Sequence, residues 1–198
     1  MRFIVLLVFS LFVFNRMEAQ IMEDDFESNQ FGWTESAGKR GIAIIRDGVL
    51  HMESKGTKPL TSTCYAPFDI SKPFYMQVDA LVDKVNNDKF GILLDYEDDQ
   101  NYILFYVFEG EAKLEVYREG KIIGRKEEAI KLNKGKKIGV TFEVDYKLNE
   151  LEFKVNGIRA MTFRRRITKD EFLLGTSGIG FFAKGGQVID FDNLKITQ

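Results

Sequence analysis

Residues 138–163, with the sequence IGVTFEVDYKLNELEFKVNGIRAMTF, restrict most strongly what this chain can fold into. Apolar and polar side chains alternate along 138–147, a period of two that is typical of a β-strand with one buried and one solvated face. The alternation returns at 151–155, and Asn156-Gly157 then offers two residues that tolerate the positive φ angles of a tight hairpin turn. The segment therefore predicts antiparallel strands whose apolar face must be covered by a second sheet.

The rest of the chain is a series of short candidate strands. They lie at 42–45, 49–52, 74–82, 90–96, 102–108, 114–117, 121–123 and 188–196. One segment, 168–174, has helical character, because Thr168 and Glu171 are spaced as a capping box. Many short strands with turns at regular spacing predict an all-β sandwich or barrel with one short helix.

The N-terminal residues differ from the rest in composition. Met1-Arg2 gives a positive start, and the apolar run at 3–14 is shorter than the ~20 residues that a membrane span needs. Such a run is typical of a secretory signal peptide at 1–19, with Ala19 before the cut; a buried strand or a single membrane anchor is the alternative. We therefore expect an exported, periplasmic or extracellular protein, without a transmembrane segment in its mature chain. The remaining 20–198 are of a size that predicts a single domain.

Charge and residue counts exclude several classes of function. The formal net charge is −2, which argues against a nucleic-acid partner because such binding needs clustered positive charge. With one cysteine, Cys64, and one histidine, His51, the chain has no intrachain disulfide and no set of Cys and His ligands for zinc. Both residues lie among apolar neighbours, so we expect them to be ordinary strand residues.

Seven short motifs occur in order along the chain. They are DDFESNQFGW at 24–33, RDGVL at 46–50, FYMQVDALV at 74–82, NYILFYV at 101–107, FKVNG at 153–157, SGIGFFA at 177–183 and FDNLKI at 191–196. Their order and spacing resemble those of secreted concanavalin A-like, laminin-G-like domains. The resemblance implies a two-sheet antiparallel jelly-roll β-sandwich. That family includes lectins, carbohydrate-binding modules, laminarinase-type glycoside hydrolases and keto-disaccharide hydrolase-like domains, and the fold does not choose among them.

Two acidic clusters are candidates for calcium, which binds several oxygen ligands. Residues 95–99 look like a calcium loop, but the glycine of the sharp turn is missing and Tyr106 occupies the position of the closing Glu, so a solvated hairpin tip is the better interpretation. The resemblance implies a second site, because related modules hold a structural Ca²⁺ where the first and last strands pair. Its ligands here would be Asp24 or Asp25 with Asp192. The alternative is that these acids are ordinary polar residues at strand ends.

Several candidate strands have a second face that is rich in tyrosine. At 102–108 the core row is Ile103, Phe105 and Val107, which leaves two tyrosines on the other face. If these strands neighbour one another in one sheet, tyrosines stand among Gln, Asp and Glu on its outer surface. That mixture suits sugars, whose apolar ring faces stack on aromatic rings while their hydroxyls take hydrogen bonds. The predicted glycan-binding residues are Tyr75, Gln77, Asp79, Tyr102, Tyr106 and Tyr117; a buried second face or an inverted register is the alternative.

Catalysis of the laminarinase type would need the motif E-x-D-x-x-E, whose first and last Glu act as nucleophile and general acid ~5 Å apart. Glu143 and Asp145 match its first two acids, but Leu148 replaces the second Glu. Glu143 and Asp145 also alternate outward, which indicates a solvated face. Other acids, Asp79, Asp95 and Glu115, lie on different candidate strands, and nothing in the sequence pairs them.

We therefore expect a non-catalytic glycan-binding module, with no catalytic residues assigned. A keto-disaccharide hydrolase-like enzyme is the second hypothesis, and a laminin-G-like structural module with a protein partner is the third. The basic segments 134–137 and 164–166 are interpreted as solvated hairpin tips, with a weak contact to an anionic glycan as the alternative.

Overall fold

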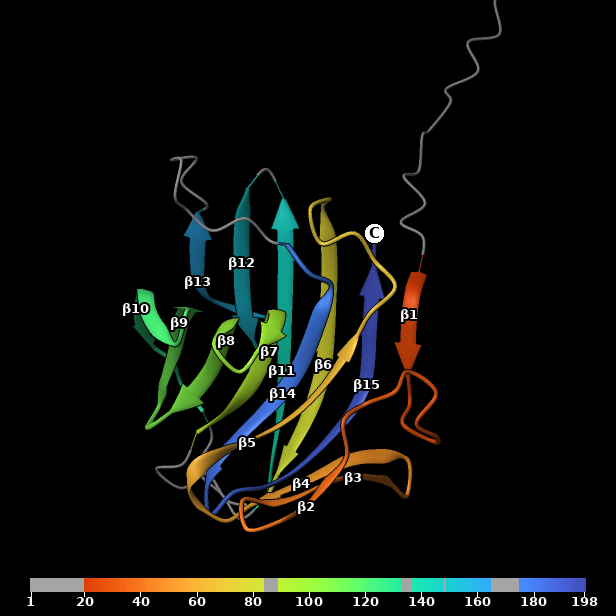
Figure 1. The fold of residues 1–198 in the computed structure, drawn as a ribbon. Coiled ribbons are helices and arrows are strands. Elements are labelled where there is room, and N and C mark those ends of the chain that lie inside the picture. The colour runs from red at the N-terminus through yellow and green to blue at the C-terminus, as the bar shows by residue number, and fades with distance from the viewer. Residues whose placement is uncertain (1–19, 84–88, 133–136, 148, 165–174) are drawn as a thin grey trace, which may run out of the picture.

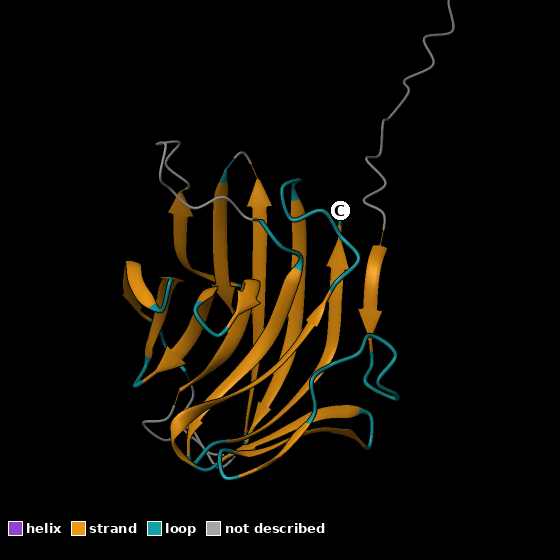
Figure 2. Ribbon diagram, in the orientation of Figure 1, coloured by secondary structure: helices purple, strands orange, loops and turns teal. Residues whose placement is uncertain are grey.

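The structure is a computed structural model that describes residues 20–83, 89–132, 137–147, 149–164 and 175–198. The described residues form fifteen strands and no helix (Figures 1 and 2). The strands are β1 (Gln20–Asp24), β2 (Ser36–Gly38), β3 (Gly41–Arg46), β4 (Val49–Ser54), β5 (Gly56–Tyr65), β6 (Phe74–Val82), β7 (Lys89–Asp98), β8 (Asn101–Phe108), β9 (Glu111–Arg118), β10 (Lys121–Ala129), β11 (Ile138–Lys147), β12 (Glu150–Val155), β13 (Ile158–Arg164), β14 (Gly178–Gly185) and β15 (Val188–Thr197). The predicted signal peptide at 1–19 and the predicted helix at 168–174 lie outside the described residues.

Two antiparallel sheets form a sandwich, as predicted. A nine-stranded sheet has the order β13-β12-β11-β6-β15-β4-β3-β2, with β1 paired to β15, and a six-stranded sheet has the order β10-β9-β8-β7-β14-β5. The strands of the six-stranded sheet cross in front of the nine-stranded sheet in Figure 1. No helix among the described residues has the length and apolar character of a membrane span.

The core lies between the two sheets and follows the predicted alternation. The β11 side chains in this core are Ile138, Val140, Phe142, Val144 and Tyr146, and the β8 side chains in it are Ile103, Phe105 and Val107, as expected. Contacts between the sheets are aromatic: the Phe105 ring lies 4.6 Å from Phe153 and 5.9 Å from Phe142, centroid to centroid. Such rings bury large apolar areas, which is the main favourable term for the sandwich.

The hairpin between β12 and β13 forms at Asn156-Gly157, as predicted. Asn156 has φ 52° and Gly157 has φ 74°, which are the left-handed values that a two-residue turn requires. The Asn156 side chain also accepts a hydrogen bond from the backbone N–H of Thr141, at 2.8 Å, and so ties the turn to β11.

Candidate functional site

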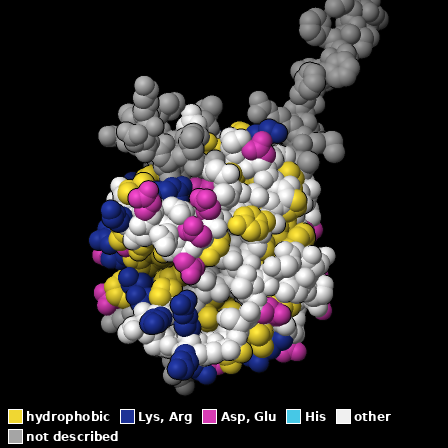
Figure 3. All heavy atoms as spheres, viewed as in Figure 1, with side chains coloured by type: hydrophobic (Ala, Val, Ile, Leu, Met, Phe, Trp, Pro, Cys, Tyr) yellow, Lys and Arg dark blue, Asp and Glu magenta, His cyan; other side chains and the backbone are white. Residues whose placement is uncertain are grey.

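The outer side of the six-stranded sheet carries an apolar cluster that is separate from the core. Leu93, Leu104, Tyr106 and Phe182 are buried there, and Tyr96, Tyr102 and Phe108 pack against them. We call this surface the aromatic face. Viewed from the same side, the molecule shows hydrophobic side chains interspersed with charged ones (Figure 3). Because strand side chains alternate, β8 can supply the core with one row and this face with the other.

A glycine allows the strands of the aromatic face to approach closely. Gly91 on β7 is the register partner of both Phe182 on β14 and Tyr106 on β8. A Cβ at position 91 would lie 2.1 Å from the carbonyl oxygen of Phe105, so no other residue fits this backbone. The Tyr106 and Phe182 rings lie 6.1 Å apart, centroid to centroid.

Three tyrosines from three adjacent strands form a row at one end of the aromatic face. Tyr102 stacks on Tyr117 with ring centroids 4.6 Å apart and an interplanar angle of 24°, and Tyr96 lies 6.3 Å from Tyr102. Offset stacking of this kind holds each ring in one orientation. The row therefore offers a rigid aromatic surface.

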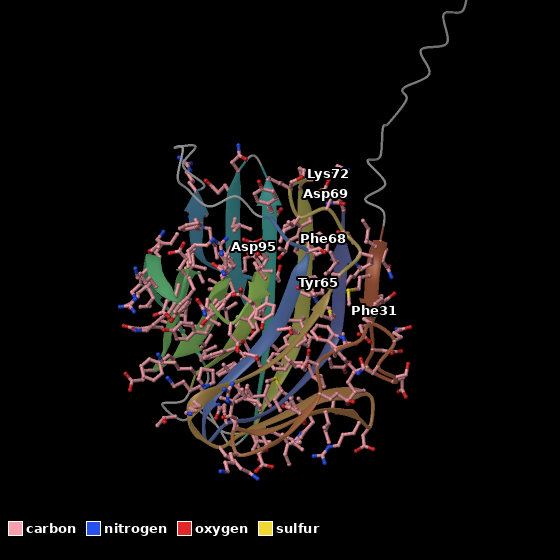
Figure 4. The ribbon with its side chains drawn as sticks, in the orientation of Figure 1. Phe31, Tyr65, Phe68, Asp69, Lys72 and Asp95 are labelled. Carbon is pink, nitrogen blue, oxygen red and sulfur yellow. The ribbon has the colours of Figure 1, made fainter. Side chains whose placement is uncertain are left out.

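Tyr96 joins this row because of a bulge in β7. Asp95 has φ 49°, and the pairing with β8 shifts between Leu94 and Asp98. The Asp95 carboxylate, labelled in Figure 4, is buried and accepts hydrogen bonds from Arg118 and from the backbone N–H groups of Gly175 and Thr176. A bulge adds one residue to the strand and so changes which side chains share a face.

Glu115 on β9 is the charged centre of the aromatic face. Its buried carboxylate accepts the Tyr117 hydroxyl at 2.7 Å, the Tyr106 hydroxyl at 3.2 Å and Nη2 of Arg125 at 2.9 Å. Burial raises the pKa of both tyrosines well above the ordinary value for a phenol, and the negative charge of Glu115 raises it further. Both hydroxyls therefore stay protonated and serve as donors that fix the rings.

Two hollows open on this side of the molecule. The first, about 260 Å³, is called the tyrosine pocket, and its lining is aromatic with a polar rim: Leu93, Tyr96, Tyr102, Phe182, Thr61, Asp99, Arg40, Lys58 and Pro59. The second, about 350 Å³, is called the lysine pocket and is lined by Gly56, Thr57, Lys89, Phe108, Lys184, Gly185 and Gly186.

The structure brings only half of the predicted glycan-binding residues together. Tyr102, Tyr106 and Tyr117 share the aromatic face. Tyr75, Gln77 and Asp79 lie on β6 in the nine-stranded sheet, so the condition that all these strands neighbour one another in one sheet is not met. Alternation shows which residues of one strand share a face, but strand pairing is non-local and decides which strands are neighbours.

The outer face of the nine-stranded sheet also differs from expectation. Glu143 and Asp145 have side chains only 15% and 21% exposed, so they are not an ordinary solvated face. The Tyr75 hydroxyl lies 2.9 Å from both Gln77 Oε1 and Glu143 Oε2, and Asp79 accepts a hydrogen bond from Thr141. These side chains therefore form hydrogen bonds with one another across β6 and β11.

The predicted calcium ligands, Asp24, Asp25 and Asp192, each accept a hydrogen bond within the protein. Asp24 is buried, and its two carboxylate oxygens accept hydrogen bonds from the backbone N–H of Phe26 and from Nε1 of Trp33. Asp25 accepts the N–H of Glu27, and Asp192 accepts the N–H of Asn193. Across the described ranges, no three or more His, Cys, Asp or Glu side chains gather as metal ligands.

The remaining singled-out residues behave as strand residues. Cys64 is buried on β5, and burial together with the charge of Asp24 raises the pKa of its thiol to about 12. His51 lies on β4 with Nδ1 2.7 Å from Asp190 Oδ1 on the adjacent β15.

Sequence reasoning missed Tyr96, Phe182, Lys89 and Lys184 as residues of the aromatic face. Phe182 had a readable signal: Phe181 and Phe182 are adjacent, and on a strand two adjacent apolar residues indicate that both faces are apolar. Tyr96 had no such signal, because a bulge in β7 changes the face on which its side chain lies. Lys89 and Lys184 meet only through the pairing of β7 with β14.

No protein-family model matches the sequence, and a search of curated proteins found no similar sequence. Solved structures do resemble the fold. The carbohydrate-binding module CBM66 from Bacillus subtilis has a TM-score of 0.61 at 15% identity, with 86% of this chain and 98% of that chain covered. A protein of unknown function with a galectin-like fold, also from Bacillus subtilis, has a TM-score of 0.68 at 11% identity, covering 91% and 96%.

A third similar structure is the laminarinase from Flavobacterium sp. UMI-01. Its TM-score is 0.62 at 14% identity, with 91% of this chain and 100% of that chain covered. At such identities the likeness concerns the fold alone. The chain thus has the fold of the concanavalin A-like, laminin-G-like jelly-roll β-sandwiches.

Proposed function

We propose that this protein is a glycan-binding module and that its aromatic face holds the sugar. The observation that carries the proposal is the tyrosine pocket, where Tyr96, Tyr102 and Phe182 stand beside Thr61 and Asp99. Sugar rings have apolar C–H faces and polar edges, so a site of aromatic walls with a few polar groups suits them.

The aromatic face is prepared for binding before a ligand arrives. Tyr102 is stacked on Tyr117, and the Tyr117 hydroxyl is held by Glu115. Rings that are already ordered lose little conformational entropy when a ligand docks, which favours affinity. Among the similar structures, one is named a carbohydrate-binding module and another a laminarinase, which supports a sugar as the ligand.

Hydrolysis is the second candidate, because one similar structure is a laminarinase and Glu115 is a buried carboxylate on the same face. Glycoside hydrolysis ordinarily uses two carboxyl groups that flank the scissile bond. On this face Glu115 pairs with Arg125, and Glu111 and Glu127 pair with Lys113, while Asp99 accepts the Tyr96 hydroxyl. The geometry therefore favours binding without turnover.

The test is a broad glycan screen on the purified protein, followed by titration of the best ligand into variants. Tyr96→Ala and Tyr102→Ala should each weaken binding about 3- to 10-fold, the range expected for loss of one aromatic contact. Tyr75→Ala is the matched control, since it removes a partly buried tyrosine from the outer face of the other sheet. Thermal unfolding confirms that each variant is folded.

Two results would overturn the proposal. One is a screen in which no glycan binds the folded protein. The other is a ligand whose affinity falls in Tyr75→Ala but stays unchanged in both Tyr96→Ala and Tyr102→Ala. Release of reducing sugar from the bound glycan would instead establish the hydrolase alternative.

A further inference from the structure

Two lysines lie next to each other in the lysine pocket. Lys89 on β7 and Lys184 on β14 are register partners, so their side chains leave the same face of the sheet from adjacent strands. Directly opposed residues of like charge destabilise a sheet. A pair of this kind has no structural benefit of its own.

Two neighbouring cations, Lys113 and Arg125, are paired with acids, whereas no acid among the described residues pairs with Lys89 or Lys184. Lys113 lies 2.7 Å from Glu111 and 3.4 Å from Glu127, and Arg125 lies 2.9 Å from Glu115. Within the part of the chain that the structure describes, no ion pair includes Lys89 or Lys184. The lysine pocket therefore carries two positive charges that its described surroundings leave unbalanced.

Lys89 is held in a defined position. Its Nζ lies 5.0 Å from the centroid of the Tyr106 ring and 5.1 Å from that of Phe108, and it donates a hydrogen bond to the Tyr106 hydroxyl at 3.4 Å. Burial lowers the pKa of Lys89; Glu115 opposes this, and the charges of Lys184, Lys113 and Arg125 lower the pKa further. An anion in the pocket would stabilise the charged form of Lys89 against both its burial and the repulsion from these cations.

The wall of the pocket beside the lysines consists mainly of glycine. Gly56, Gly185 and Gly186 line it, so no side chain projects from these positions. A ligand group that enters can approach the backbone closely.

The lysine pocket continues the tyrosine pocket along one strand. Phe182 lines the tyrosine pocket, and Lys184, two residues further on β14, lines the lysine pocket. Residues two apart on a strand share a face and are spaced about 7 Å apart. A ligand of more than one sugar ring can therefore lie in both hollows.

We propose that the lysine pocket binds the anionic group of an acidic glycan, a carboxylate or a sulfate ester, whose adjoining sugar ring lies in the tyrosine pocket. The inference rests on the proposed function and adds the class of sugar. It concerns Lys89 and Lys184 and makes no use of the basic segments 134–137 and 164–166.

The experiment compares matched ligands. Oligogalacturonate and its methyl ester differ only at the carboxyl group, which is charged in the acid and neutral in the ester, and dextran sulfate and dextran differ only in the sulfate esters. The purified protein should bind the acidic member of at least one pair tenfold or more tightly, as expected for charge-assisted hydrogen bonds. Whichever pair shows the difference identifies the anionic group as a carboxylate or a sulfate.

The variants are Lys89→Met and Lys184→Met, which keep the alkyl chain and remove the charge. Each should weaken binding of the acidic ligand about tenfold and leave the neutral ligand unaffected. The matched control is Lys195→Met, which removes one exposed lysine from the nine-stranded sheet and should change neither. The unfolding temperature of Lys184→Met should stay equal to that of the wild type or rise, because a like-charge contact is removed.

Failure of this inference can be told apart from failure of the proposed function. If Tyr96→Ala weakens glycan binding while both lysine variants bind as the wild type does, the face binds sugars but the anionic subsite is wrong. Equal affinity for the acidic and neutral members of both pairs would have the same meaning. If Lys195→Met weakens acidic ligands as much as Lys184→Met does, the attraction is one of overall charge and the subsite is again wrong.

Discussion

Gly91 illustrates how a single residue shapes the aromatic face. It lies between Tyr106 and Phe182 in register, and its backbone is so close to β8 that a Cβ would overlap the carbonyl oxygen of Phe105. Backbone atoms cannot move aside as the end of a flexible side chain can. The restriction at this position is therefore one of space.

Gly91→Ala should destabilise the protein by about 2 kcal/mol or more, because overfilling a packed site forces the backbone to shift. The measurement is urea unfolding at equilibrium. Gly139→Ala is the matched control: it also lies on a strand, β11, but a Cβ there meets nothing within 4 Å. The control should stay within about 0.5 kcal/mol of the wild type. Similar stabilities of the two variants would contradict this account of Gly91.

At the scale of elements, β7 does most to determine the composition of the site. Its bulge at Asp95 turns Tyr96 toward Tyr102 on β8, and its first residue, Lys89, lies beside Lys184 on β14. The bulge is held by the Asp95 carboxylate, which bonds to Arg118 and to the backbone of residues 175 and 176. One buried acid thus maintains the position of one wall of the tyrosine pocket.

Asp95→Ala should cost about 3–5 kcal/mol, the range for breaking a buried ion pair by removing one partner. Glycan affinity should fall as well, since Tyr96 loses its support. Urea unfolding and ligand titration measure the two effects. Glu97→Ala, which removes an exposed acid two residues further along β7, should alter neither. A stable Asp95→Ala variant that binds glycan normally would show that the bulge does not depend on this carboxylate.

At the scale of the whole molecule, the protein holds several protons that an unfolded chain would lose in alkali. Burial raises the pKa of Cys64 to about 12, and burial with nearby acids raises the pKa of Tyr96 to about 12 and those of Tyr75, Tyr106 and Tyr117 further. These groups lie in both sheets and in the core. Their titration therefore reports on the intact sandwich.

Stability should fall as pH rises from about 9, the ordinary pKa of a cysteine thiol, to about 12, the raised pKa of Cys64 in the folded protein. In that window the unfolded chain releases the Cys64 proton while the folded chain keeps it, so the free energy of unfolding decreases with pH. The slope for one such group approaches about 1.4 kcal/mol per pH unit. Urea midpoints at successive pH values measure it.

Cys64→Ala is the control for the contribution of the thiol. It should lower stability at neutral pH, because it removes a buried side chain, yet its stability should depend less steeply on pH above about 9. An unchanged slope would mean that the tyrosines alone cause the alkaline loss.

The sequence by itself determined the local features of the protein. Alternation along β6, β8 and β11 correctly separated core residues from outer ones, because the period of a strand is a property of its own backbone. Asn156-Gly157 marked a hairpin for a similarly local reason, the φ angles of two residues. The seven ordered motifs correctly predicted the jelly-roll sandwich. The signal peptide stays a prediction.

Only the tertiary structure decided which local features meet. Tyr75 and Tyr102 have the same pattern in sequence, yet they lie in different sheets. Tyr96 reaches the aromatic face through a bulge, and Lys89 meets Lys184 across 95 positions of sequence through the pairing of β7 with β14. Strand pairing depends on how the complete core is buried, so residues far apart in the chain become neighbours for reasons that no single segment contains.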